Sequence, residues 1–194
     1  MLQYLWGIFL ENELLGKVQS KLLRGIERNV PDNNDQSLHH FISDSPWDER
    51  AVIDHIQRDV TELIGDETNG SIHIDESAFP KGGLDSVGVK RQYCGRLGKV
   101  ENCQVGVFLG YTNGLYRTLI DEALYLPKDW AEDMKRRKKC GVPRNVSFKT
   151  KAELGLEMVL HARDSNVPFG WIGLEWTASM ENKHGSEIEL MLKG

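Results

Sequence analysis

The feature that most constrains the fold of this chain is a change of hydrophobic periodicity near Gly70. After Gly70, segment 71–75 alternates polar and apolar residues as a half-buried strand does. Before it, apolar residues recur at helical spacing: Val52, Ile53, Ile56, Val60, Leu63 and Ile64. A helical first third followed by strands predicts an α/β (α+β) fold, in the order helices, three or four antiparallel strands, helix, strand.

The N-terminal helical region is expected over residues 1–66. Ser45 is predicted to cap a helix that has Pro46 at its first position, where a missing N–H is harmless, and that ends before Gly65. An earlier helix over about 2–28 would end before the turn-forming segment 31–35.

The rest of the chain is expected to alternate between strands and one helix. Strands are predicted over residues 86–93, 102–111, 116–126 and, as a short buried strand, 169–175, with 95–99 as a hairpin connection. Residues 127–150 lack periodicity and are read as a basic insertion or loop. Thr150 and Glu153 form a capping box for a helix that carries Leu156, Val159 and Leu160.

Composition and charge narrow the classes of partner. No apolar run is long enough to span a membrane, and three cysteines without a C-x-x-C pair favour a reducing cytoplasm. The net charge of −5 excludes a uniformly basic surface, but residues 81–99 carry 5 Lys/Arg against 1 Asp/Glu and residues 128–151 carry 9 against 3. These segments would suit an anionic partner, or they are simply solvated.

Two acids are candidate metal ligands. Asp75 would be exposed on a strand that is otherwise built for burial, where its carboxylate could hold Mg²⁺ or merely cap a turn. Glu175 follows a later strand, and carboxylates on neighbouring strands are how nucleases bring two cations to one phosphodiester. The six histidines share no ligand spacing, and a P-loop is not present.

Long motifs of this chain resemble the catalytic core of bacterial insertion-sequence DDE transposases. The segments that carry the resemblance are 37–47 (SLHHFISDSPW), 74–83 (IDESAFPKGG), 86–108 (SVGVKRQYCGRLGKVENCQVGVF), 125–130 (YLPKDW) and 148–154 (FKTKAEL). In all, the resemblance covers about residues 4–174. The resemblance implies a ribonuclease H-like catalytic domain, here an incomplete mixed sheet with helices over residues 70–175, and it matches Asp75 to the first catalytic Asp.

The same resemblance implies cofactors and partners. Intact members use Mg²⁺ (or Mn²⁺) and act on transposon-end DNA, and this chain would also meet a second copy or a full-length transposase, with no membrane partner. The basic residues expected to face DNA phosphates are Lys81, Lys90, Arg91, Arg96, Lys99, Arg136 and Arg137.

The match stops after Leu174. At this position the family has a segment similar to WIGMDGFYG, whereas residues 171–179 of this chain are WIGLEWTAS. Codons that encode the residues from Glu175 on can, in another reading frame, also encode the family motif. This suggests a frameshift near Leu174, which would make 176–194 a divergent, out-of-frame tail and leave Asp75 as the surviving family acid. If the tail is instead genuine, Glu175 is a candidate metal ligand beside Asp75. Whether the chain is an enzyme stays open. We expect no DNA cleavage by this chain alone. The alternatives are a non-catalytic DNA-binding competitor of a full-length transposase and, apart from the resemblance, a metal-binding α/β domain.

Overall fold

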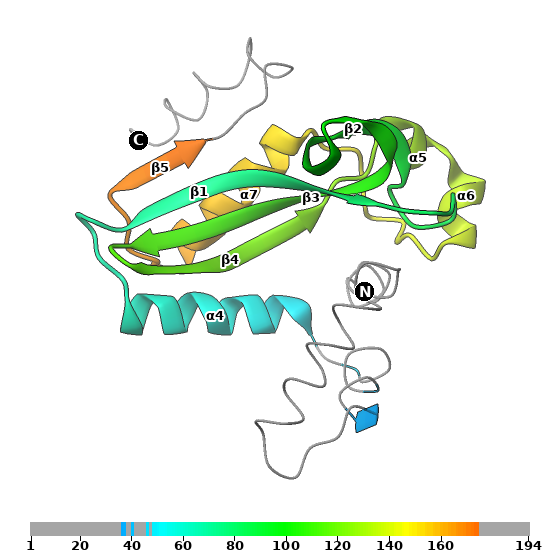
Figure 1. Ribbon diagram of the computed structural model, residues 1–194. Coiled ribbons are helices and arrows are strands. Elements are labelled where there is room, and N and C mark those ends of the chain that lie inside the picture. The colour runs from blue at the N-terminus through cyan, green and yellow to red at the C-terminus, as the bar shows by residue number, and fades with distance from the viewer. Residues whose placement is uncertain (1–35, 38–39, 41–45, 47, 175–194) are drawn as a thin grey trace.

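A mixed five-stranded sheet forms the centre of the computed structural model, which describes residues 36–37, 40, 46 and 48–174. The predicted helix at 2–28, Ser45, Glu175 and the tail 176–194 lie outside the described residues. The strands are β1 (Ser71–Pro80), β2 (Lys90–Cys94), β3 (Lys99–Asn113), β4 (Tyr116–Leu124) and β5 (Trp171–Leu174). The sheet order is β2-β3-β1-β5, and β4 also pairs with β3 (Figure 1).

The direction of β5 sets the fold class. Strand β3 runs antiparallel to β1, β2 and β4, whereas β5 runs parallel to β1, with Ser71 opposite Trp171. Parallel neighbours need a crossover connection, and helix α7 (Lys151–Asp164) lies between β4 and β5 in the chain. The predicted α/β fold is confirmed, with the mixed sheet that a ribonuclease H-like domain has.

The main core lies on one face of this sheet. Ile72 and Ile74 of β1 are buried, whereas His73 and Asp75 between and after them are exposed. A Cβ added at Gly155 of α7 would lie 3.0 Å from Ile74 Cγ2, so a glycine lets the helix approach β1 closely. The other buried members of this core are Val60, Val107, Leu109, Tyr111, Ile120, Met158, Val159, Ala162 and Val167.

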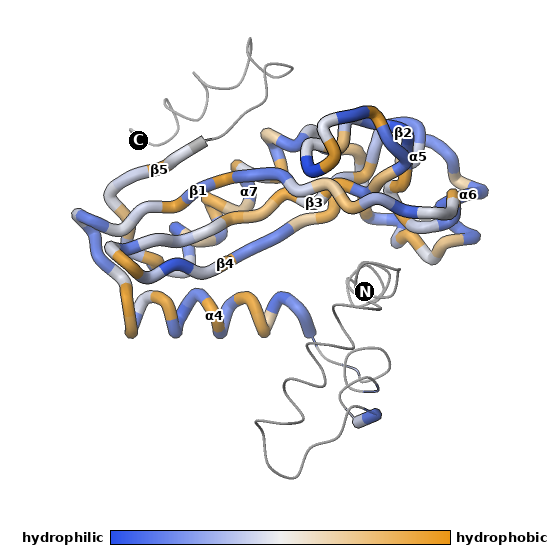
Figure 2. Tube along the Cα trace, in the orientation of Figure 1, coloured by the Kyte–Doolittle hydropathy of each residue, from blue (hydrophilic) through white to orange (hydrophobic). Residues whose placement is uncertain are grey.

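Helix α4 (Glu49–Leu63) confirms the predicted helix but not its beginning. Asp48 is the N-cap, since its carboxylate accepts the backbone N–H groups of Arg50 (3.0 Å) and Ala51 (3.3 Å). Pro46 lies outside the helix. The carboxylate of Asp48 satisfies two of the free N–H groups in the first turn of the helix. The helix therefore begins at Glu49, three residues after the predicted first position, Pro46. Hydrophobic and hydrophilic residues alternate along α4 at helical spacing (Figure 2).

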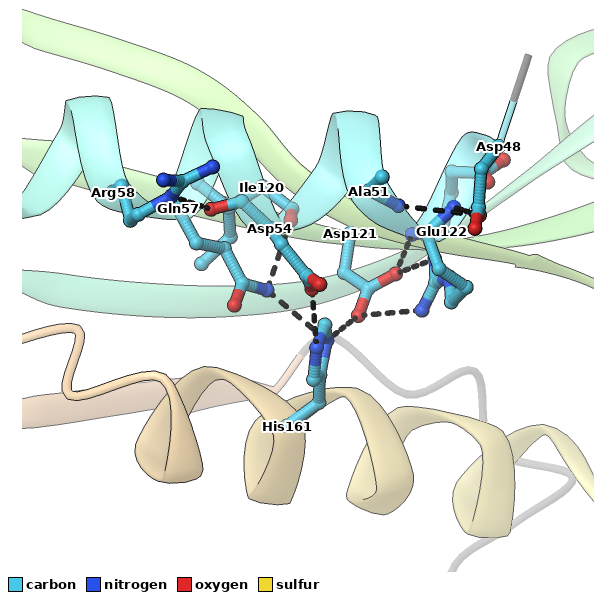
Figure 3. A network of polar contacts seen from close by, with 10 residues as sticks. Asp48, Ala51, Asp54, Gln57, Arg58, Ile120, Asp121, Glu122 and His161 are labelled. Atoms are coloured by element: carbon cyan, nitrogen blue, oxygen red, sulfur yellow. Dashed lines mark hydrogen bonds and ion pairs between the residues drawn. The ribbon is translucent and has the colours of Figure 1, made fainter.

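A polar network fastens α4 to β4 and α7 (Figure 3). The side chain of Asp121 on β4 is fully buried and accepts two hydrogen bonds from the Arg50 guanidinium, at 2.6 and 3.3 Å. His161 of α7 places Nδ1 2.9 Å from Asp121 and Nε2 2.9 Å from Asp54. Gln57, also fully buried, donates to the carbonyl of Ile120. The sequence alone gave no signal for this network.

The basic segment 127–150 is more ordered than predicted. It contains helices α5 (Lys128–Glu132) and α6 (Met134–Lys139) and a small core in which Trp130 is fully buried. The indole N–H of Trp130 donates to the carbonyl of Val89 at 2.7 Å, which ties the segment to the stretch before β2. We call residues 127–147 the basic module. The loop prediction was wrong because a single buried Trp, rather than a periodic face, organises it.

The remaining elements are of the predicted type, but several bounds differ: β2 begins at Lys90 rather than at residue 86, and β3 covers 99–113 rather than 102–111. The capping box of Thr150 and Glu153 is confirmed, and the connection after β2 is a short 3₁₀ turn, η1 (Gly95–Leu97). Strand β4 ends at Leu124 rather than at residue 126. Strand β5 is not wholly buried, because Trp171 is 69% exposed at its first position.

Candidate functional site

Asp75 lies on the exposed face of β1, a strand with neighbours on both sides. Because side chains alternate along a strand, its two flanking residues Ile74 and Glu76 face the other side. Phe108 of β3 is opposite Asp75 in the register, and Ile74 is paired with Leu174 of β5. The fold therefore supports the Asp75 backbone firmly while it leaves the carboxylate open to solvent.

The two adjacent acids have different surroundings. The Glu76 carboxylate forms an ion pair with Lys151, the first residue of α7. In contrast, the hydrogen bond that the structure gives the Asp75 carboxylate is a local one, from the Glu76 N–H at 2.7 Å. No cation of the described residues is paired with Asp75. Its charge is thus available for a metal ion, whereas the charge of Glu76 is already compensated.

The donor chemistry of Asp75 suits a hard divalent cation, which prefers carboxylate oxygens. One carboxylate is an incomplete site, and within the described residues no three His, Cys, Asp or Glu side chains are grouped to hold a metal. Glu175, the second predicted ligand, follows Leu174 in sequence but lies outside the described residues. Its role stays a prediction.

His73 is a neighbour of Asp75 that sequence reasoning passed over. It lies on the same face two residues earlier, and its Nε2 is 3.0 Å from Ser71 Oγ and 3.3 Å from Thr112 Oγ1. A Cβ at Gly173 would lie 2.5 Å from His73 Nδ1, so only glycine fits beside the ring on β5. The available signal was the alternation His73, Asp75 on one strand together with a glycine in the strand that follows α7.

The basic residues predicted to contact DNA differ in whether their charges are already paired within the protein. Lys90 is paired with Asp129 at 2.9 Å and Lys99 with Glu101 at 3.1 Å, both near the surface. Arg91 and Arg96 are exposed on the β2–β3 hairpin. Exposed pairs of this kind are weak and exchange readily with another anion.

Lys81 is unlike the other predicted contacts, since it is only 8% exposed. Burial lowers the pKa of its ammonium group. The structure places it directly after the last residue of β1, six residues beyond Asp75.

Arg136 and Arg137 hold the basic module together. The Arg136 guanidinium lies 3.6 Å from the centre of the Trp130 ring and donates to the carbonyl of Leu84. Arg137 is 7% exposed and donates to the carbonyls of Ala131, Pro143, Arg144 and Val146. Because the guanidinium of Arg137 already donates its hydrogen bonds to backbone carbonyls, it is poorly placed to bind a phosphate, and we assign Arg137 a structural role.

No helix among the described residues is long and apolar enough to cross a membrane. The three cysteines are free thiols, and burial raises the pKa of Cys103 to about 11.

The chain is similar in sequence to a transposase. Over 106 residues it is 38% identical to a probable transposase for insertion sequence element IS701 from Microchaete diplosiphon, an alignment that covers 50% of this chain and 27% of that protein. The chain thus spans about a quarter of the length of this relative. No solved structure matches with significance.

A family model described as DDE superfamily endonuclease matches residues 6–173. The match includes β1 with Asp75, the β3–β4 hairpin, the basic module, α7 and nearly all of β5. The chain belongs to the DDE superfamily of endonucleases.

Proposed function

We propose that this chain forms part of the catalytic domain of an insertion-sequence transposase, which cleaves and joins DNA at transposon ends. The observation that carries the proposal is the exposed, unpaired carboxylate of Asp75 on a strand of the mixed sheet that has neighbours on both sides. The family match and the similarity to a probable transposase support it.

Asp75, together with Glu175, would hold divalent metal ions, Mg²⁺ or Mn²⁺. Bound there, they would supply activation of water or of a DNA 3′-hydroxyl for attack on a phosphodiester. The chain's own contribution is positioning. The register with β3 fixes the Asp75 backbone, and β5 pairs with β1 up to the preceding residue, Ile74. The Glu76–Lys151 ion pair keeps the neighbouring carboxylate from competing for the cation.

Exposed basic residues would bind the DNA phosphates. Arg91, Arg96 and the weakly paired Lys90 and Lys99 lie on or next to the β2–β3 hairpin, and Lys135 and Lys138 are exposed on the basic module. Such contacts give affinity that falls steeply with salt and carries little sequence information. A second copy of the chain or a longer transposase would be the protein partner.

The first experiment tests Asp75 as a metal ligand. Mn²⁺ binding to the wild type, to Asp75→Asn and to Glu62→Gln is measured by electron paramagnetic resonance, with Glu62 as an exposed control acid on α4. We expect D75N to weaken the tightest site at least about 10-fold and E62Q to leave it unchanged. Equal binding by all three proteins would reject Asp75 as a ligand.

The second readout is nicking of transposon-end DNA with Mg²⁺. Our prediction is that this chain by itself gives none, because the described site supplies one free carboxylate. Nicking by the wild type that D75N loses and E62Q keeps would contradict this prediction, yet it would establish Asp75 as catalytic.

A further inference from the structure

The β2–β3 hairpin is anchored to the sheet by one of its two faces. Cys94 of β2 and Cys103 of β3 are fully buried and form a small core with Ala78 and Val105. The Cys94 thiol contacts the carbonyl of Ala78 at 3.9 Å. Because this face is packed, the opposite face is held in a fixed orientation.

That opposite face is apolar and basic, although it is exposed. The register pairs Tyr93 with Val100 and Arg91 with Asn102. Tyr93 is 55% exposed and Val100 is 53% exposed. A cross-strand pair of this kind stabilises the hairpin slightly, but hairpin pairing alone does not require an aromatic ring and an arginine side by side at the surface. We call Lys81, Arg91, Tyr93, Val100 and Asn102 the ribbon face.

The Asn102 side chain joins Lys81 to this face. The Lys81 N–H donates to the Asn102 carbonyl at 2.9 Å, and the Asn102 side-chain amide donates to the carbonyls of Lys81 and Gly83, both at 2.8 Å. The turn after β1 is thereby fixed beside Arg91, the residue opposite Asn102.

Lys81 is the second, independent sign of a ligand. The residue is 8% exposed, and no described residue forms an ion pair with its ammonium group. The Nζ atom is not among the fully buried polar atoms that lack a partner, so this partly desolvated cation still reaches the surface and is suited to an incoming anion. Arg91 adds a second positive charge to this face, whereas Lys90 and Lys99 are opposite Cys103 and Cys94 in the register and are paired with Asp129 and Glu101.

We propose that the ribbon face binds a nucleotide of a locally unpaired DNA strand, with its phosphate at Lys81 and Arg91 and its base stacked on Tyr93. An aromatic ring beside a basic groove is the combination that binds single strands, because an unpaired base offers its face for stacking whereas a paired one does not. The inference rests on the proposed function and adds to it a contact for unpaired DNA away from Asp75.

The test compares two fluorescent probes by anisotropy: a blunt duplex and the same duplex with a four-nucleotide single-stranded overhang. The proteins are wild type, Tyr93→Ala, Tyr93→Phe, Lys81→Met and Tyr116→Ala, where Tyr116 is a matched tyrosine that is 66% exposed on β4. We expect Y93A to weaken binding of the overhang probe about 5- to 150-fold and to leave duplex binding unchanged. Y93F and Y116A should behave as the wild type.

Lys81→Met should weaken both probes and reduce the slope of log affinity against log salt by about 1. Circular dichroism melting verifies that each variant is folded. As a measurement that needs no variant, photo-crosslinking with 5-bromodeoxyuridine in the overhang should label Tyr93 in the wild type.

The outcomes separate the two proposals. If the wild type binds neither probe, the proposed function fails. If it binds both probes, Y93A is folded and equal to Y116A on the overhang probe, and crosslinks map elsewhere, then the ribbon-face inference is overturned while DNA binding stands. A second result would also overturn the ribbon-face inference: the wild type dimerises with increasing concentration, Y93A does not, and no crosslink forms at Tyr93. The ribbon face would then bind a second copy of the chain.

Discussion

In this protein, neighbouring residues of the same chemical type have different surroundings and different partners. Asp75 and Glu76 are both acids on β1, but strand alternation directs one to solvent and the other to Lys151. Arg136 and Arg137 differ similarly, since one stacks on Trp130 and the other is buried among carbonyls. Residue type alone therefore predicted which side chains are charged, but not which charges are free.

Arg137 is expected to be a stabilising residue rather than a DNA contact. Replacing it with methionine leaves backbone carbonyls of the basic module without donors, and each hydrogen bond to a charged group contributes about 1.5–3 kcal/mol. We predict that Arg137→Met lowers the free energy of unfolding by about 3 kcal/mol, as measured by urea denaturation. The exposed neighbour provides the control: Lys138→Met should change stability by less than about 0.5 kcal/mol. A folded, equally stable R137M with weakened DNA binding would show that Arg137 is a contact after all.

The stability of the turn before β1 should depend on pH through Asp66. Its carboxylate accepts the N–H groups of Asn69 (2.7 Å) and Thr68 (2.8 Å), and these hydrogen bonds lower its pKa from the ordinary 3.8. A lowered pKa in the folded state means that the stabilisation is present above pH 3.8 and is lost as the pH falls through the folded value. The protection factors at residues 67–70, calculated against the intrinsic exchange rate at each pH, should therefore fall in this acid range in the wild type. In Asp66→Asn this acid-dependent loss of protection should be absent, and a profile equal to that of the wild type would contradict the assignment.

At the scale of elements, helix ends and strand alternation were predictable, and contacts between distant segments were not. The capping box of Thr150 and Glu153 is local, so its four residues suffice to predict it. The beginning of α4 was misassigned because two capping candidates compete within four residues, and Asp48 makes the hydrogen bonds. The exposure of Trp171 and the order in the basic module depend on partners more than 40 residues away, which no local pattern contains.

The attachment of α4 should depend on Asp121. Removing the charge of this fully buried carboxylate leaves the Arg50 guanidinium without its partner and removes an acceptor from His161. Asp121 is buried but the Arg50 side chain is 39% exposed, so the expected loss is that of a hydrogen bond to a charged group, about 1.5–3 kcal/mol. We expect Asp121→Asn to lower the free energy of unfolding by that amount in chemical denaturation.

The same network provides its own control. Asp54 contacts His161 from the other side but is 51% exposed, so Asp54→Asn should cost less than about 1 kcal/mol. Equal effects of the two substitutions would contradict the view that burial of Asp121 makes the network important.

The described residues form separate hydrophobic cores: a main core between the sheet and its helices, a second core shared by the basic module and the stretch before β2, and the small core under the β2–β3 hairpin. Trp130 is the largest buried side chain of the second core and also tethers it to Val89. We predict that Trp130→Ala increases hydrogen exchange in residues 128–146 by at least 100-fold, since losing a buried Trp costs about 3–5 kcal/mol. Exchange in β1, β3 and α7 should change far less. Uniform loss of protection across both cores would show that they unfold as one unit.

The parallel pairing of β1 with β5 also sets an order of events during synthesis. Ser71 and Trp171 are partners in the sheet but are 100 residues apart in the chain. A ribosome that adds about 5–20 residues per second needs about 5–20 s to make that stretch. The antiparallel hairpin of β3 and β4 can close during this interval, whereas segment 71–74 of β1 waits for its parallel neighbour β5. In a nascent chain, Asp75 is therefore synthesised early, whereas β5, the parallel neighbour of β1, is synthesised later. The surface proposed to bind DNA is completed only after β5 has been translated.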